Sequence, residues 1–270
     1  MTSRSGAIIT LRNTDRIFWQ NGTGGVHHHD DFYSLVAEKV TVYRASIQKL
    51  SENELYLDDE ARTHFPCDAL LCGTGWRREL EMFSTDLKIR LGLPYVKELE
   101  SPEIRTKWEK LVEEEDSKVL EKFVILRNPP PHSHVNETLT PYRLYKGMAP
   151  LDDDSILFMN HITLANKLFG AEAQAMWAVA YFDHKIDLPS VEEREREIAT
   201  WIAWCRRRHL SNGELANFVA FDGVPYVDGL LAQMGVTAHR RKGWMGNLFA
   251  PVMPADLGKA WSEYLEINSK

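Results

Sequence analysis

The chain has 270 residues, of which 44% are hydrophobic and 26% are charged, and its formal net charge at pH 7 is −7. This length suffices for one large domain or two small ones, and the eight tryptophans favour packed cores over disorder. The acidic balance excludes a general nucleic-acid-binding protein, whose surface would be basic. The short run Arg206-Arg207-Arg208 does not change this, and we interpret it as a solvated helix end.

The three cysteines provide neither a disulfide framework nor a metal-binding spacing. Cys67 and Cys72 flank an apolar run, so we expect both to be small core residues. No apolar segment approaches the ~20 residues of a membrane-spanning helix, and the first residues lack the apolar centre of a signal peptide. We therefore expect a soluble protein of the cytoplasm.

The first third of the chain predicts short strands around one helix. The helix should cover Phe32 to Lys39, with Asp30 or Asp31 as its N-terminal cap. Alternating and β-branched runs separated by turn residues predict strands at 7–11, 16–19, 40–43, 46–50 and 54–57. The apolar run Asp68-Ala-Leu-Leu-Cys72 predicts a buried strand that runs into the glycine turn Gly73-Thr74-Gly75.

The rest of the chain predicts mainly helices. Ser101 can cap a long helix with Pro102 at its first position, and Ser190 with Glu193 forms a capping box for a helix that ends near His209. The run 171–182 is apolar on most faces, which predicts a buried helix, and 155–159 predicts a buried strand. Residues after Ser211 are irregular in pattern and should complete a C-terminal extension.

The run Asp68-Ala-Leu-Leu-Cys-Gly-Thr-Gly-Trp76 resembles a strand of the flavin-containing monooxygenases. In that family a hairpin ends in an apolar strand, then Thr-Gly and an aromatic residue; here Cys72-Gly73 replaces the usual residue before Thr-Gly. A strand end without bulky side chains lets backbone N–H groups approach a cofactor pyrophosphate. The resemblance therefore implies cofactor contacts at Gly73, Thr74, Gly75 and Trp76.

Later segments are similar to fungal members of the same family in the same order. In the family the last helix of the FAD domain points its N-terminus toward the flavin, which implies cofactor contacts at Ala171 and Gln174 within Ala171-Glu-Ala-Gln174. The resemblance extends from about Phe18 onward. Its other segments are 140–150, 155–159, Leu188-Pro189 and 204–214.

The resemblance implies an α/β fold of the two-dinucleotide-domain FAD/NAD(P)-binding type, present only in part. We expect residues 1–39 to be a remnant of the NADPH-binding domain. Residues 40–185 would form the linking β-hairpin and the C-terminal part of the FAD-binding domain, and residues 186–270 a helical C-terminal extension.

The function implied is that of a flavin-dependent monooxygenase, in which NADPH reduces FAD and O₂ is activated to oxygenate a small organic substrate. The chain contains no GxGxxG motif, and we interpret Asn21-Gly-Thr-Gly-Gly25 as a turn because it lacks the flanks of a phosphate loop. We therefore expect weak or absent cofactor binding and no NADPH turnover by this chain alone. The alternative is a truncated homologue with a non-redox role as a cyclase, an isomerase or a small-molecule-binding protein.

Histidines supply the remaining candidates. We place His27-His28-His29 at a helix start rather than at a metal ion, because adjacent side chains diverge. His132 and His134 fit an exposed loop beside prolines, with a substrate-facing role as the weaker alternative. Ligands gather at the carboxyl ends of strands in α/β proteins. The residues that follow 155–159 are therefore candidates to line the flavin or substrate, with a structural role as an equal alternative: Asn160, His161 and Asn166.

Overall fold

The structure is a computed structural model that describes residues 17–19, 31–43, 45–73, 80–130, 137–237, 245–246 and 255–269. The chain divides into two compact units. Unit 1 comprises Met1–Thr14 and Val26–Arg78, and unit 2 comprises Asp15–Gly25 and Glu79–Lys270. The chain passes from one unit to the other twice inside the predicted segment 1–39 and once inside 40–185, and the assignment of segments to parent domains stays a prediction.

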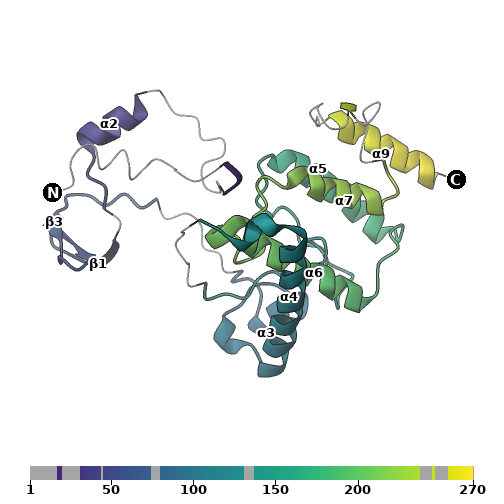
Figure 1. The fold of residues 1–270 in the computed structure, drawn as a ribbon, viewed down its shortest axis with the longest axis horizontal. Coiled ribbons are helices and arrows are strands. Elements are labelled where there is room, and N and C mark those ends of the chain that lie inside the picture. Colours follow the sequence, from purple (N-terminus) through teal and green to yellow (C-terminus); the bar gives the residue numbers. More distant parts are fainter. Residues whose placement is uncertain are drawn as a thin grey trace. The chain divides into compact units, whose positions relative to one another are not determined.

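Unit 1 contains the helix α2 (Phe32–Lys39) and a three-stranded antiparallel sheet, shown in Figure 1. Its strands β1 (Ser46–Ser51), β2 (Glu54–Asp58) and β3 (His64–Pro66) follow one another in space as in sequence. The helix and the first hairpin confirm the sequence prediction in their bounds, although Asp31 stands at the N-cap position of α2 without a side-chain capping hydrogen bond. The predicted strand 40–43 is wrong, because this segment has no ladder pairing and instead stacks Tyr43 on Phe65 with ring centroids 5.3 Å apart.

The buried strand predicted at 68–72 is also wrong. Leu71 is 94% exposed and Cys72 is exposed, while Cys67 is only partly buried, so neither cysteine is a core residue. Backbone pairing ends where the N–H of Cys67 donates to the carbonyl of Asn53. A strand needs a neighbour for its backbone and a cover for its apolar face, and no described strand pairs with this run.

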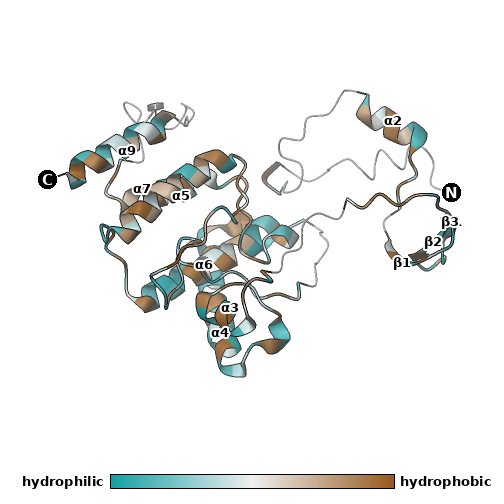
Figure 2. Cartoon of the chain, turned by 180° about the vertical axis from the view of Figure 1, so that it is seen from behind, coloured by the Kyte–Doolittle hydropathy of each residue, from teal (hydrophilic) through white to brown (hydrophobic). Residues whose placement is uncertain are grey.

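Unit 2 is helical and holds the main core. Its longer helices are α3 (Thr85–Leu91), α4 (Pro102–Lys122), α5 (Lys167–Phe182), α6 (Val191–His209), α7 (Gly223–Gln233) and α9 (Ala255–Asn268). Short 3-10 turns follow α3, α4 and α6 at Lys97–Leu99, Val124–Arg127 and Leu210–Asn212, and another lies near the start of the chain at Ile17–Trp19. The helix α4 packs on α6, and α5 packs on α7 and α9. Figure 2 shows that apolar residues are denser on α5 and α7 than on α4.

Local capping signals fix the helix starts, as the sequence predicts. The Ser101 hydroxyl accepts a hydrogen bond from the N–H of Ile104, and Pro102 opens α4. Ser190 and Glu193 form a reciprocal capping box at α6. The helix α5 begins four residues before the predicted start, because the side chain of Asn166 caps it by accepting from Phe169.

The helix α5 is the centre of the core, which confirms the predicted buried helix. Nine of its sixteen residues are buried, among them Met176 and Trp177. The indole of Trp177 is fully enclosed and donates to Gln233 on α7 at 2.9 Å. Val179 and Phe182 lie on the opposite side and are 44% and 48% exposed. One face of α5 therefore packs in the core, and the opposite face is partly exposed to solvent.

Three further expectations need correction. Residues 155–159 form no strand; the N–H of Phe158 pairs with the carbonyl of Met148, and Phe158 covers Phe83 edge-on at 5.8 Å. Ile17–Trp19 is a 3-10 turn, not a strand, and Trp19 is buried in unit 2 beside Leu126. Residues after Ser211 are not irregular throughout, because they include α7 and α9. Short apolar runs fix burial but not the type of element that buries them.

The basic residues Arg207 and Arg208 at the end of α6 contact other segments of the chain, so this helix end is not simply solvated. Arg208 is buried, donates to the carbonyl of Phe18 and lies over the Phe18 ring, 4.1 Å from its centroid. Arg207 forms two hydrogen bonds with Asp116 on α4, at 2.7 Å and 2.6 Å.

The broad α/β class is confirmed by the helices and the sheet, although that sheet is small and antiparallel; a parallel sheet of the dinucleotide-binding type is not found among the described residues. Within the same part of the chain, no helix combines the length and apolar character needed to cross a membrane.

The two faces of α5 should respond differently to truncation. We expect Met176→Ala to lower the free energy of unfolding by about 2–5 kcal/mol, because it removes buried contacts and leaves a cavity. Val179→Ala on the exposed face should change it by roughly 0.5 kcal/mol or less. Urea denaturation followed by far-UV circular dichroism measures both, and equal losses would contradict the assigned orientation of the helix.

Candidate functional site

The amide of Gln174 joins three segments that are far apart in the sequence. Its Oε1 accepts a hydrogen bond from the backbone N–H of Asn160 at 2.8 Å, and its Nε2 donates to the hydroxyl of Tyr226 at 2.8 Å. Tyr226 donates in turn to the carbonyl of Lys146 at 3.0 Å. Gln174 is 1% exposed, and a buried amide requires such partners. The amide thus holds the loop at Asn160 against α5 and α7.

The imidazole of His161 lies beside this network. Its Nε2 is 2.7 Å from the carbonyl oxygen of Gly147, and its ring stacks on Tyr142 with centroids 4.2 Å apart. A carbonyl only accepts, so Nε2 carries the proton and, in the neutral ring, Nδ1 is an acceptor. Nδ1 is buried and has no hydrogen-bond partner among the described residues. Burial lowers the pKa of His161 to about 4, against the opposing effect of the Gly147 hydrogen bond.

The backbone around these groups adopts left-handed conformations. Gly147 has φ of +64°, and a Cβ there would lie 2.4 Å from Cδ1 of Ile162, so the position requires glycine. Lys146 and Asn160 also have positive φ values, 53° and 61°, although neither is glycine. Such conformations persist only where surrounding contacts hold them, and they concentrate at functional sites.

We call this group the Asn160–Gln174 cluster. It consists of two backbone carbonyl groups and four side-chain-bearing residues that the hydrogen bonds above connect or place side by side: the carbonyls of Lys146 and Gly147, and Asn160, His161, Gln174 and Tyr226. Within the cluster, hydrogen bonds hold a neutral His161 imidazole whose Nδ1 is an unused acceptor. Such a group can accept a proton or a hydrogen bond from a bound molecule.

The structure brings together three of the predicted site residues: Asn160, His161 and Gln174. Asn166 lies apart from the network and caps α5, which is the structural role that the sequence left open. Ala171 is half-buried on α5, three residues before Gln174. Their predicted contacts with a cofactor stay predictions.

Gly73 belongs to unit 1, where it is exposed and a Cβ would meet nothing within 4 Å. The other predicted pyrophosphate residues, Thr74, Gly75 and Trp76, lie outside the described residues, and so do the glycine cluster 21–25, His27 to Asp30, and the loop histidines His132 and His134. No group of histidine, cysteine or carboxylate side chains in the described ranges could hold a metal ion.

Sequence reasoning missed Tyr226, Tyr142 and the Lys146-Gly147 turn. Residues 140–150 were singled out for their similarity to fungal proteins, but nothing in their pattern marked Tyr142 or the turn carbonyls as site components. Tyr226 lies in a region without a clear periodic pattern. Only the similarity of 140–150 could have directed attention to this part of the site.

Comparison with known proteins identifies the chain as a homologue of fungal FAD-dependent monooxygenases, matching their C-terminal portion. FAD-dependent monooxygenase rstn6 of Aspergillus nomiae NRRL is 30% identical over 260 residues, which cover 93% of this chain and 44% of the relative. FAD-dependent monooxygenase resA of Aspergillus sclerotiorum is 29% identical over 265 residues, with 94% and 45% covered.

A FAD-dependent monooxygenase of Pyrenophora dematioidea is 31% identical over 238 residues, covering 84% of this chain and 42% of that protein. The chain therefore spans less than half the length of these curated relatives. No family model matches the chain, and no solved structure matches it. The family resemblance seen in the sequence is confirmed by these relatives.

The buried imidazole should make stability depend on pH. The folded pKa of about 4 lies below the unfolded value of 6.5, so the unfolded chain binds the proton first as pH falls. The contribution of His161 is therefore complete above pH 6.5 and is lost as pH falls toward 4, by about 2 kcal/mol at pH 5.

Urea denaturation at pH 7 and pH 5 measures this loss. His161→Gln keeps a donor for the Gly147 carbonyl and should reduce the difference between the two pH values by about that amount. The control His184→Gln removes an exposed histidine and should leave the difference unchanged. An unchanged pH dependence in His161→Gln would contradict the buried neutral imidazole.

Proposed function

We propose that this chain forms the C-terminal part of a flavin-dependent monooxygenase of fungal secondary metabolism, and that the Asn160–Gln174 cluster lines its flavin or substrate pocket. The homology to FAD-dependent monooxygenases supports the class of reaction. The observation that carries the site is the buried, unused acceptor at Nδ1 of His161. A buried polar atom without a partner calls for an explanation, and a bound donor supplies one.

The residues of the cluster fit one edge of a flavin. FAD, when bound, supplies the redox chemistry, accepting reducing equivalents from NADPH and activating O₂. The flavin ring carries a single N–H donor, which is complementary to a neutral imidazole acceptor. In this proposal His161 accepts that hydrogen bond or one from the substrate, and the Gly147 carbonyl fixes its tautomer.

The other residues of the cluster have positioning roles. Both ends of the Gln174 amide are engaged within the protein, so Gln174 holds Asn160 and Tyr226 in place instead of contacting the cofactor through a free amide. Tyr142 covers one face of the His161 ring and keeps water from it. This arrangement preorganises the acceptor before any ligand binds.

The cofactor phosphates need other segments. The chain has no GxGxxG motif, so the proposal assigns the main phosphate contacts to the part of the monooxygenase that this chain does not match. The turn Gly73-Thr74-Gly75 would contribute backbone N–H groups, which the exposure of Gly73 permits. NADPH would likewise bind mainly to the unmatched portion.

A chimera tests the function. In it, this chain replaces the matched portion of the Aspergillus sclerotiorum monooxygenase. We expect the chimera to bind FAD and to oxidise NADPH, whereas the 270-residue chain alone should not consume NADPH above the rate with free flavin. Absorbance at the nicotinamide band follows the reaction. A chimera that folds but binds no FAD would refute the monooxygenase assignment and favour a non-redox role.

A substitution in the chimera tests the site. His161→Phe keeps an aromatic ring for Tyr142 but removes both the Nδ1 acceptor and the Nε2–H donor to Gly147, and it should weaken FAD binding or slow NADPH oxidation by about tenfold or more. His184→Phe, at an exposed position, is the matched control. Unchanged FAD affinity and unchanged rates in His161→Phe would show that the cluster is structural and that the flavin pocket lies elsewhere.

A further inference from the structure

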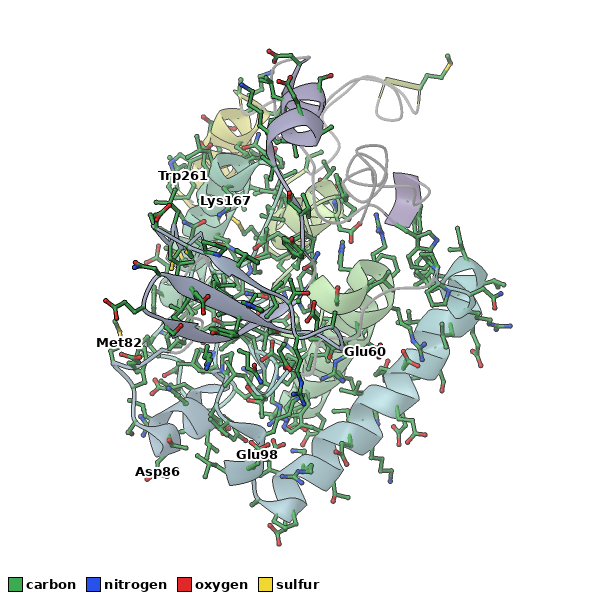
Figure 3. The ribbon with its side chains drawn as sticks, turned by 90° about the vertical axis from the view of Figure 1, so that its left-hand side faces the viewer. Glu60, Met82, Asp86, Glu98, Lys167 and Trp261 are labelled. Atoms are coloured by element: carbon green, nitrogen blue, oxygen red, sulfur yellow. The ribbon has the colours of Figure 1, made fainter. Side chains whose placement is uncertain are left out.

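A cavity of about 980 Å³ opens in unit 2 between α4 and α6. The segments 97–100, 140–143 and 210–214 complete its walls, and none of the four residues of the Asn160–Gln174 cluster lines it. Figure 3 labels Glu98, which lies close to the start of α4 on this wall. Neither the proposed flavin chemistry nor the homology assigns any role to this cavity.

The floor of the cavity is apolar. Val112 on α4 is half-buried and faces the cavity, whereas Ile202 on α6 and Leu126 from the turn after α4 lie beneath it with no accessible surface of their own. Trp108 lines it as well, and one face of its indole is covered by the guanidinium of Arg143, 4.8 Å from the ring centroid. A ligand body that rests on this floor would need to be apolar.

Arg143 is the polar centre of the cavity wall. It is only 9% exposed, and its Nη1 donates to Glu100 at 2.6 Å, while Tyr95 donates to the same carboxylate oxygen at 3.0 Å. This ion pair leaves one donor of the guanidinium unused, because its Nε is buried and has no hydrogen-bond partner among the described residues. A buried donor on a cavity wall favours an acceptor from outside the chain.

A second arginine on the wall has the same property. The Nε of Arg206 is also buried without a hydrogen bond, although Glu214 approaches it to 3.5 Å. Glu214 therefore lowers the electrostatic cost of burying Arg206 without satisfying its donor. Two arginine donors from α6 and from the segment 140–143 thus line one cavity.

Five cationic and six carboxylate side chains line the cavity, so its net charge is close to zero, but three of the six carboxylates are exposed whereas four of the five cations are buried or half-buried. Its buried and half-buried lining has one more cation than carboxylates: Lys97, Arg143, Arg206 and Arg207 against Glu100, Asp116 and Glu214. The remaining charged side chains, Arg105, Glu98, Glu109 and Glu113, are exposed, where solvent screens them.

We propose that this cavity binds an organic acid, with its carboxylate toward Arg143 and Arg206 and an apolar body against Trp108 and Val112. Arginine presents a fork of donors that matches a carboxylate, and the apolar floor favours a carbon skeleton over a free inorganic anion. The site stands apart from the Asn160–Gln174 cluster, so it is a ligand site additional to the proposed flavin pocket.

Isothermal titration calorimetry of the 270-residue chain with 2-naphthoate tests the proposal. We expect saturable binding with a dissociation constant below about 1 mM. The neutral 2-naphthamide and the cationic 2-naphthylmethylamine have nearly the same body and should bind at least about tenfold more weakly. Inorganic phosphate should bind more weakly than naphthoate. The proposal fails if naphthoate does not bind, or if the amide, the amine or phosphate binds as well as it does.

Substitutions at Arg206 and Arg143 test whether naphthoate binds in this cavity. Arg206→Lys keeps the charge but removes the Nε donor, and it should weaken naphthoate binding about tenfold. Arg90→Lys, at an exposed arginine that does not line the cavity, is the matched control and should bind as the unchanged chain does. Arg143→Lys should also weaken binding. If Arg143→Lys does not fold because Glu100 loses its ion-pair partner, the test of the site rests on Arg206→Lys alone. Unchanged binding in Arg206→Lys would overturn the site.

Discussion

The need to satisfy one buried amide governs much of unit 2. Gln174 lies on the most buried face of α5, where an unpaired polar group would cost roughly 1–3 kcal/mol. Its two ends therefore fix the loop at Asn160 and the hydroxyl of Tyr226. Because Tyr226 also bonds to Lys146, a single side chain sets the distances among a helix, a loop and a turn. An apolar residue of the same size would fill the space, but the N–H of Asn160 and the hydroxyl of Tyr226 would lose their hydrogen bonds to residue 174.

The orientation of His161 follows from that frame. The turn at Gly147 has φ of +64°, a conformation that glycine adopts without strain, and its carbonyl oxygen lies 2.7 Å from Nε2 of the imidazole. The carbonyl then assigns the proton to one ring nitrogen and leaves the other as an acceptor. A catalytic or binding histidine needs such a partner to define its tautomer, and here the partner is backbone, which substitution cannot easily remove.

Helix starts, which depend on residues close together in the sequence, can be predicted from the sequence. Strands and distant side-chain contacts, which depend on partners elsewhere in the chain, cannot. Ser101 with Pro102, and Ser190 with Glu193, predict the starts of α4 and α6 because capping involves residues within one turn. The runs 68–72 and 155–159 failed as strands because a strand depends on a partner that its own residues do not specify. Asn160, His161 and Gln174 are candidates from the sequence that the structure brings together, but Tyr226, 52 residues beyond Gln174, carries no local mark. The pairing of Arg143 with Glu100 spans 43 residues and was equally invisible.

The stacking of Arg208 on Phe18 has a consequence for how the chain is built. It anchors residues 17–19 to the end of α6, so the chain belongs to unit 2 before it enters Val26–Arg78 and again after it leaves. This part of unit 1 is thus an insertion with both ends tethered, and not a terminal appendage. Its sheet supplies its own short-range pairing, whereas unit 2 must close a loop of 190 residues between Phe18 and Arg208. In modular terms, the inserted sheet is a cassette, because all of its strand pairing lies within residues 46–66.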